Sequence, residues 1–330
     1  MRSIFLALAT ILAVAAARAE RFSFVAFGDM PYCTESAMER CPAEERRVAD
    51  LMAAINAARP VFSVFLGDTK GGAEHCTDER VLRALGWMAL ADHPLVYTPG
   101  DNEWTDCWQG RAGRFDPLDR LTLIRTRFFS GPESLGQRTL PLLRQAEADP
   151  ANRIYVENAI WTRQGVVFAT IHLPGSNNNR PTDPEERPSL RPPETAMAEY
   201  TARNTANLAW LNAAFAEAAR TNSRAVVIML QADLFYAQRC GRGYVSGYRD
   251  TIAALERHAR AFGRPVMLLN GDSHFFLEDR PIPSAPNLLR VMVPGASDVR
   301  AVRIEVDTDA DDPWRFTLFG PDDRAAGPSC

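Results

Sequence analysis

The sequence RFSFVAFGD, residues 21–29, decides the fold, because an alternating and then apolar run ends abruptly in a glycine and an aspartate. Such alternation is typical of a β-strand. Three later runs end in the same way, with Gly-Asp at 67–68, 100–101 and 271–272. Glycine allows a sharp turn at a strand end, and ligands of open α/β sheets bind beyond the carboxyl ends of the strands. The repeated pattern predicts one cleft that receives several carboxylates.

The segments around these turns predict the rest of the fold. Apolar strands are expected at 61–66, 94–98, 166–171, 225–230 and 265–269, and helices at 44–58, 78–90, 195–220 and 248–262. Short β-like runs follow at 288–293, 301–306 and 314–319. No internal repeat or linker interrupts the chain. We therefore expect one α/β domain over residues 20–330.

The N-terminus has the order of a secretory signal peptide. Arg2 precedes an apolar run over residues 4–17, and Ala17-Arg18-Ala19 is a small-x-small cleavage pattern. We expect removal of residues 1–19 and export to the periplasm or the extracellular space, with an uncleaved anchor helix as the alternative. Because the run is shorter than the roughly 20 residues that a bilayer span requires, and no later run is longer, the mature chain is expected to lack a membrane span.

The charge balance argues against some partners. Removal of Arg2 and Arg18 reduces the 37 basic residues to 35 against 41 acidic ones, so the net charge changes from −4 to −6. Nucleic acids and anionic membranes attract clustered positive charge. The composition therefore indicates no nucleic-acid partner, and it leaves the oligomeric state open.

The six cysteines favour disulfide bonds over a metal motif. They contain no Cys-x-x-Cys spacing, and an even number in an exported chain is typical of disulfides. Of the fifteen possible pairings, we favour Cys33–Cys41, Cys76–Cys107 and Cys240–Cys330. The first two bonds would brace loops that follow expected metal ligands.

The carboxylates at the strand ends indicate a metal site. Four such groups in one cleft repel each other unless cations neutralise them. Oxygen ligands favour hard cations such as Mg²⁺, Mn²⁺ or Ca²⁺. We therefore expect one or two divalent metal ions at Asp29, Asp68, Asp101 and Asp272.

Five short motifs make the chain resemble the calcineurin-like metallophosphoesterase superfamily. That superfamily carries Asp-x-His, Gly-Asp-x-x-Asp, Gly-Asn-His-Asp/Glu, a lone His and Gly-His-x-His, in this order. The corresponding segments here are 28–31 (GDMP), 67–71 (GDTKG), 100–103 (GDNE), Gln231 and 271–274 (GDSH). The resemblance spans Phe22 to about Phe276. It implies a four-layer α/β/β/α sandwich with two mixed sheets and a phosphoric ester hydrolase activity.

The resemblance also implies individual roles. Asp29, Asp68 and His274 match metal ligands, with Asp68 as the bridging one. Asp101 matches the ligand Asn and Asn102 the catalytic His, although a shift of one residue would make Asn102 the ligand.

Three further histidines of the family pattern are replaced, by Pro31, Gln231 and Asp272. Gln231 and Asp272 still offer oxygen ligands, so the site moves from mixed nitrogen and oxygen toward oxygen. This change favours magnesium, manganese or calcium over zinc or iron.

An imidazole general acid is absent from the third motif, because Asn102 cannot protonate a leaving group. His172, which follows the strand 166–171, is a candidate for that role, and its alternative is a buried polar residue with a satisfied hydrogen bond. Glu103 is a further catalytic candidate next to the cleft. For substrate binding we expect Lys70, the only lysine, together with Asn177 and Arg180 in the long loop after His172.

Together these observations predict an exported phosphoesterase. It would hydrolyse small-molecule phosphomonoesters or phosphodiesters by attack of metal-bound hydroxide. The alternative is a metallophosphoesterase fold kept as a non-catalytic binding or scaffold protein. The chain has neither a Gly-x-Ser-x-Gly elbow nor a Gly-x-Gly-x-x-Gly turn after the first strand, which argues against a serine hydrolase and a dinucleotide-binding enzyme.

Overall fold

The computed structural model describes residues 21–33, 41–321, 327 and 330. The expected signal peptide, residues 1–19, lies outside the described residues and stays a prediction. Within the described ranges, no helix combines the length and the apolar character that crossing a membrane requires.

Two β-sheets form the centre of the molecule. The strands of the first sheet are β1 (Phe22–Phe27), β2 (Ser63–Phe65), β3 (Leu95–Tyr97), β11 (Ala301–Val306) and β12 (Trp314–Phe319). Those of the second are β4 (Leu143–Arg144), β5 (Ala159–Arg163), β6 (Val166–Thr170), β7 (Ala225–Met229), β8 (Val266–Asn270), β9 (Leu277–Asp279) and β10 (Leu288–Met292). Their orders are β12-β11-β1-β2-β3 and β4-β5-β6-β7-β8-β10-β9.

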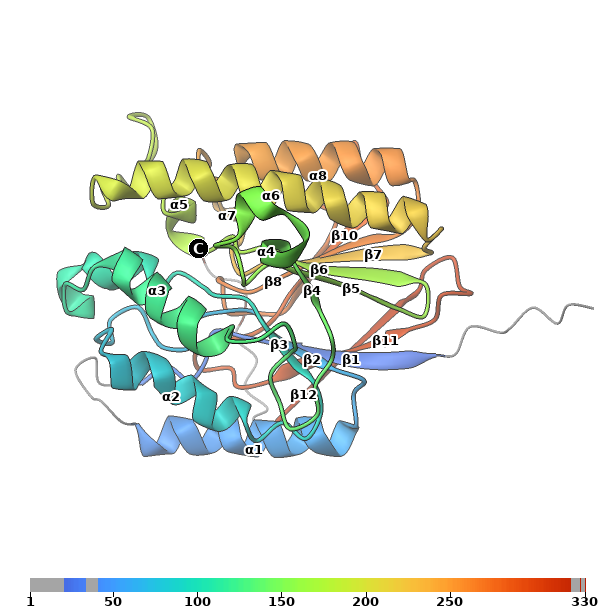
Figure 1. Ribbon diagram of the computed structural model, residues 1–330, viewed down its shortest axis with the longest axis horizontal. Coiled ribbons are helices and arrows are strands. Elements are labelled where there is room, and N and C mark those ends of the chain that lie inside the picture. Colours follow the sequence, from blue (N-terminus) through green and yellow to red (C-terminus); the bar gives the residue numbers. More distant parts are fainter. Residues whose placement is uncertain (1–20, 34–40, 322–326, 328–329) are drawn as a thin grey trace, which may run out of the picture.

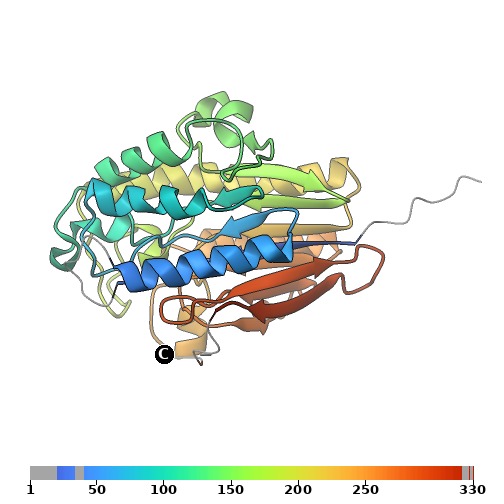
Figure 2. The same ribbon diagram turned by 90° about the horizontal axis from the view of Figure 1, so that it is seen from below.

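Helices cover the outer faces of both sheets. The α-helices of the described residues are α1 (Pro42–Ala58), α2 (Asp78–Met88), α3 (Pro117–Phe128), α4 (Gln145–Ala148), α5 (Gly175–Asn178), α6 (Thr195–Arg220), α7 (Tyr236–Cys240) and α8 (Arg249–Phe262). In Figure 1, α1 and α2 lie below the first sheet, and α6 and α8 lie above the second. Figure 2 shows α1 running beside the red β11–β12 hairpin, which forms one edge of its sheet. This arrangement confirms the predicted four-layer α/β/β/α sandwich.

The helices form where apolar residues recur at helical spacing. In α1, Val48, Leu51, Met52 and Ile55 are buried, and they occupy one face of the helix. The 26 residues of α6 contain neither glycine nor proline, so no residue breaks the helix before Arg220.

An aromatic cluster joins the two sheets. The ring of Phe168 on β6 lies 5.4 Å from Phe24 on β1, 5.1 Å from Phe62 and 5.4 Å from Trp161 on β5, measured between ring centroids. Phe24, Phe62 and Phe168 are almost completely buried. Side chains of both sheets therefore share one core, which fixes how the strand ends of the two sheets face each other.

Parallel pairing brings the motif residues to a common edge. β1, β2 and β3 are parallel neighbours, and so are β6, β7, β8 and β10. Their carboxyl ends lead into Asp29, Asp68, Gln231 and Asp272. The backbone N–H of Asp272 donates to the carboxylate of Asp29 at 3.0 and 3.1 Å, so the edges of the two sheets meet there.

Three disulfide bonds are present: Cys33–Cys41, Cys76–Cys107 and Cys240–Cys330. The predicted pairing is therefore confirmed. Cys33 and Cys76 lie in the loops after Asp29 and Asp68, as expected, and their partners are the N-cap residue of α1 and a residue of the 3₁₀ turn Thr105–Trp108. The third joins the end of α7 to residue 330.

We expect the substitution Phe168→Ala to lower the free energy of unfolding by about 3–5 kcal/mol, because it leaves a cavity where the two sheets meet. Leu143→Ala is the matched control, since the Leu143 side chain is 51% exposed and should change stability by only about 0.5 kcal/mol. Urea unfolding followed by circular dichroism measures both. Equal losses for the two variants would contradict a shared aromatic core.

Candidate metal centre

Three side chains from the two sheets converge at the common edge. Asp29 follows β1, Asp68 follows β2, and His274 lies four residues after β8. Their potential ligand atoms all lie within 4.8 Å of one another. Asp29 and Asp68 are buried, whereas His274 is half-buried. Carboxylate oxygens and an imidazole nitrogen at this separation can coordinate one metal ion.

The backbone at this edge is strained. Asp29, Asp68, Asp272 and His274 have φ values of 55°, 59°, 77° and 66°. A left-handed conformation is unfavourable for residues with a Cβ and costs on the order of 1–3 kcal/mol where the surroundings enforce it. Strain of this kind concentrates at functional sites, and here it is found at four residues predicted as ligands.

Two glycines let the strand ends approach each other. A Cβ at Gly100 would lie 2.1 Å from Oδ1 of Asp68, and one at Gly271 would lie 2.1 Å from Oδ2 of Asp29. Both distances are far below van der Waals contact. In two of the four Gly-Asp motifs, the glycine thus makes room for the carboxylate of another motif.

Hydrogen bonds orient Asp68. The backbone N–H of Asn102 donates to its Oδ1 at 3.0 Å, and the side-chain amide of Asn102 donates to its Oδ2 at 2.8 Å. The hydroxyl of Tyr32 also donates to Oδ2 at 2.8 Å and lies 3.3 Å from Nε2 of His274. Tyr32 therefore contacts two members of the cluster.

Tyr32 was missed by the sequence analysis. It lies one position after Pro31, which replaces a family histidine. A polar aromatic residue directly after a substituted ligand position could have indicated that Tyr32 contacts the cluster.

Asp101 is a further carboxylate close to Asp68. Its Oδ1 accepts from the side-chain amide of Gln231 at 3.2 Å, and its Oδ2 accepts from the hydroxyl of Ser176 at 2.7 Å. Asp272 is close by, and its Oδ2 accepts from the backbone N–H of Asp233 at 2.9 Å. Asp101 and Gln231, both predicted as ligands, are thus in direct contact.

The electrostatics of the edge show an excess of negative charge. Burial raises the pKa of Asp29, Asp68 and Asp272 well above the usual range, and carboxylate neighbours raise each further. Burial, together with the charge of Asp101, raises the pKa of Asp106 to about 7. These groups lack enough positive partners among the described residues, so a cation fits their donor set.

His274 complements the carboxylates. Burial lowers the pKa of its imidazole to about 4, so the ring is neutral at physiological pH. A neutral imidazole keeps a nitrogen lone pair available for a metal ion.

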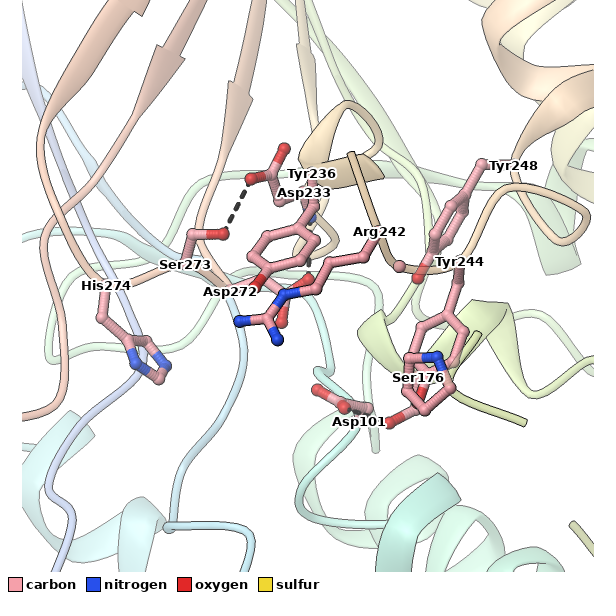
Figure 3. A pocket seen from close by; sticks show the side chains of 12 residues that line it. Asp101, Ser176, Asp233, Tyr236, Arg242, Tyr244, Tyr248, Asp272, Ser273 and His274 are labelled. Atoms are coloured by element: carbon pink, nitrogen blue, oxygen red, sulfur yellow. Dashed lines mark hydrogen bonds between the residues drawn. The ribbon is translucent and has the colours of Figure 1, made fainter. Parts of the chain in front are cut away.

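A cavity of about 470 Å³ opens beside the cluster. Its lining residues are Asp101, Ser176, Pro188, Asp233, Tyr236, Arg242, Gly243, Tyr244, Tyr248, Asp272, Ser273 and His274 (Figure 3). Three of them, Asp101, Asp272 and His274, were predicted as metal ligands. The cavity has the volume of a small-molecule site.

Comparison with solved structures identifies the fold. A dimetal phosphatase from Danio rerio is similar over 91% of this chain and 98% of that chain, with a TM-score of 0.52 and 12% sequence identity. The chain has the calcineurin-like metallophosphoesterase fold. A purple acid phosphatase from yellow lupin (Lupinus luteus) seeds is similar over 92% of this chain and 54% of the lupin chain, with a TM-score of 0.49 and 12% identity. No family model and no curated protein matches the chain.

Glu103, predicted as catalytic, contacts the backbone next to the ligand cluster. Its Oε1 accepts from the hydroxyl of Tyr97 at 2.8 Å and from the backbone N–H groups of Gly100 and Asp68 at 2.8 and 3.2 Å. Glu103 is fully buried. These contacts hold the third motif against Asp68, and a catalytic role of Glu103 stays a prediction.

His172 lies in the interior of the metallophosphoesterase fold. Its Nδ1 lies 2.7 Å from Oε1 of Glu157, and its ring is 5.3 Å from that of Trp104. Arg125 forms an ion pair with Glu157 at 2.6 Å. This geometry corresponds to the alternative of a buried polar residue with a satisfied hydrogen bond, so a catalytic role for His172 stays a prediction without a contact to the cluster.

The three predicted substrate-binding residues lie outside the cavity lining. Lys70 is buried and its ammonium donates to the carbonyl of Gly71 at 3.1 Å. Burial lowers the pKa of Lys70. The Asn177 amide donates to the hydroxyl of Ser246 at 3.0 Å. Arg180 forms an ion pair of 2.8 Å with Asp183. Their roles in substrate binding stay predictions.

The Glu157–His172 pair makes stability depend on pH. Burial lowers the pKa of His172 to about 4, below the usual 6.5. The stability that the neutral His172 ring contributes to the folded state is therefore complete above pH 6.5 and is lost as the pH falls toward 4. The Arg125 charge and the His172 hydrogen bond outweigh burial and lower the pKa of Glu157 to about 2, so its contribution is lost below about pH 4.5.

We expect the free energy of unfolding to fall by on the order of 2–3 kcal/mol between pH 7 and pH 4.5 through His172 alone. We expect the variant His172→Gln to be less stable at pH 7 and to have a flatter stability curve between pH 7 and pH 4.5. Urea unfolding at half-unit pH intervals measures both slopes. Identical slopes for variant and wild type would show that another group titrates there.

Proposed function

We propose that this protein is a metal-dependent phosphoesterase that hydrolyses phosphomonoesters or phosphodiesters. The observation that carries the proposal is the Asp29–Asp68–His274 cluster at the joined strand ends of a metallophosphoesterase fold, where His274 also lines a cavity. The Danio rerio protein with this fold is a dimetal phosphatase.

The donor set supports one or two divalent cations. Asp29, Asp68 and His274 would hold one ion. Asp101 and Gln231, with Asp68 as the bridging ligand, would hold a second. In this register Asp101 is the third-motif ligand, and its side chain lies next to that of Gln231. The oxygen-rich set favours Mg²⁺, Mn²⁺ or Ca²⁺ over Zn²⁺ or Fe.

A bound cation supplies a Lewis acid that activates water and offsets charge on the phosphoryl oxygens. The chain's own residues position the reaction. The Asn102 amide and the Tyr32 hydroxyl donate hydrogen bonds to the carboxylate of Asp68 and so fix its orientation. Gly100 and Gly271 allow the carboxylates to approach.

Export is part of the proposal. Three disulfides are consistent with an oxidising compartment. We infer that residues 1–19 act as a cleaved signal peptide and that the chain functions in the periplasm or the extracellular space.

A non-catalytic scaffold is the second candidate, and one observation favours it. Asn102 occupies the position of the catalytic histidine, where its amide donates to Asp68 and provides no acid for the leaving group. The two candidates share the metal site and differ in turnover.

We expect divalent metal to stabilise the wild-type protein, because a ligand that binds the folded state adds about 2.7 kcal/mol at 100 times its Kd. Added Mn²⁺ should raise the melting temperature of the dialysed protein by several degrees, and Asp68→Asn should remove most of this shift. Asp119→Asn, a substitution on the exposed face of α3, is the control that should retain it. An equal shift in all three proteins would place the binding elsewhere.

We expect hydrolysis of p-nitrophenyl phosphate or bis-p-nitrophenyl phosphate by the mature protein with Mg²⁺, Mn²⁺ or Ca²⁺. Asp68→Asn should lower kcat/KM by roughly 100-fold or more, because the charge stabilisation supplied by a metal is worth several kcal/mol. Asp119→Asn should leave kcat/KM unchanged. Metal binding without turnover of these or other phosphoesters would favour the scaffold candidate.

A further inference from the structure

The cavity beside the metal cluster has a wall that neither the sequence predictions nor the metal site explains. This wall is the segment 236–248, which consists of α7 and the loop that follows it. The lining residues that it contributes are Tyr236, Arg242, Gly243, Tyr244 and Tyr248 (Figure 3). Three tyrosines thus lie in one cavity with the predicted ligands Asp101, Asp272 and His274.

One end of the wall is fastened covalently. The Cys240–Cys330 disulfide links the end of α7 to residue 330. The backbone carbonyl of Cys330 accepts a hydrogen bond from the Arg242 guanidinium and one of 3.4 Å from the hydroxyl of Tyr236. The tether therefore holds two lining side chains, as well as the helix that carries one of them.

The other end of the wall is fastened by buried polar groups. The Glu186 carboxylate accepts from the backbone N–H groups of Val245 and Ser246 at 2.6 and 2.7 Å. Oδ1 of Asn177 accepts from the backbone N–H of Gly247 at 2.8 Å. Asn177, predicted to bind substrate, thus supports the wall that lines the cavity. A wall held at both ends presents its side chains in fixed positions, which lowers the entropy cost of binding.

The ring of Tyr236 is positioned by close contacts. The guanidinium of Arg239 lies 5.3 Å from the centroid of the Tyr236 ring. Gly243 leaves room for the same ring, since a Cβ at this position would lie 2.7 Å from its Cδ1. Tyr236 and Tyr244 are half-buried, whereas Tyr248 is buried. Tyr236 and Tyr244 therefore retain exposed aromatic surface on the cavity side.

The charges of the cavity suit an ester with one anionic end. Asp233 is neutralised by Arg239 at 2.8 Å and by Arg290 at 2.7 Å. Arg242 adds an exposed positive charge to the lining. Asp101 and Asp272 lie at the metal side, where a cation would offset them. An anionic phosphoryl group therefore fits near the cluster, and an uncharged flat group fits against the tyrosine rings that line the cavity.

We propose that this cavity binds the leaving group of the phosphoester and that Tyr236 and Tyr244 select leaving groups with a planar aromatic ring. The inference rests on the proposed function, because the metal cluster places the phosphoryl end of the substrate. Nucleotides and simple aryl phosphates share the chemistry that the cavity recognises.

The test compares two phosphonates that the protein cannot hydrolyse at a P–O ester bond. Phenylphosphonate and cyclohexylphosphonate have six-membered rings of similar size, and only the first ring is planar and aromatic. Isothermal titration of the Mn²⁺-loaded protein should show phenylphosphonate binding about three- to tenfold more tightly, which matches the usual strength of aromatic pairs.

Tyr244→Leu and Tyr236→Leu should each reduce this preference to within about twofold. Leucine keeps most of the apolar volume and removes the ring. Tyr155→Leu is the matched control, because Tyr155 lies outside the cavity lining, against Arg125, and the preference should persist. Circular dichroism confirms that each variant is folded, and having two cavity variants keeps the test informative if one of them misfolds.

Equal affinities for the two phosphonates, absence of binding by both, or a preference that survives both cavity variants would overturn the inference. Turnover of adenosine 5′-monophosphate and phenyl phosphate then distinguishes nucleotides from simple aryl esters. A phosphonate preference without turnover of any ester leaves the cavity inference intact and overturns the hydrolytic function. Turnover of an ester without a preference between the phosphonates supports the hydrolytic function and overturns the cavity inference.

Discussion

Mutual repulsion among buried carboxylates is the constraint on which the rest of this structure depends. Asp29, Asp68, Asp101 and Asp272 are held at one edge, although burial and their neighbours raise the pKa of three of them. Left-handed backbone, close-packed glycines and the core shared by both sheets keep them together. A fold that maintains such a cluster gains from a cation that neutralises it.

The fold could be predicted because its signals are local. Each Gly-Asp motif ends an apolar strand, and the spacing of apolar residues predicted helices such as α6 with the observed bounds, Thr195–Arg220. No strand or helix was predicted in the segment 105–153. It contains α3, short 3₁₀ turns and the two-residue strand β4. Such short elements are stabilised mainly by tertiary contacts rather than by their own pattern.

The candidate site was predictable where ligands end strands and less so where they depend on packing. Asp29, Asp68 and His274 converge as the motifs indicated. Tyr32 joins them through its hydroxyl, which is a contact across 242 residues of sequence that no local pattern encodes. The wall 236–248 depends on Cys330 and Glu186, both distant in sequence. His172 and Lys70 were predicted from their residue type and from their positions after the strand 166–171 and after Asp68, but both side chains are buried.

The contact between Asp29 and Asp272 spans 243 residues. An N-terminal fragment that ends before residue 272 cannot assemble the ligand cluster, because part of the edge follows β7 and β8. A chain that crosses a membrane before it folds would therefore bind its metal only after it has left the cytosol. The ion would be chosen by whatever is abundant outside, so the supply of Mg²⁺, Mn²⁺ or Ca²⁺ in that compartment, rather than cytosolic metal homeostasis, would set which form of the protein exists.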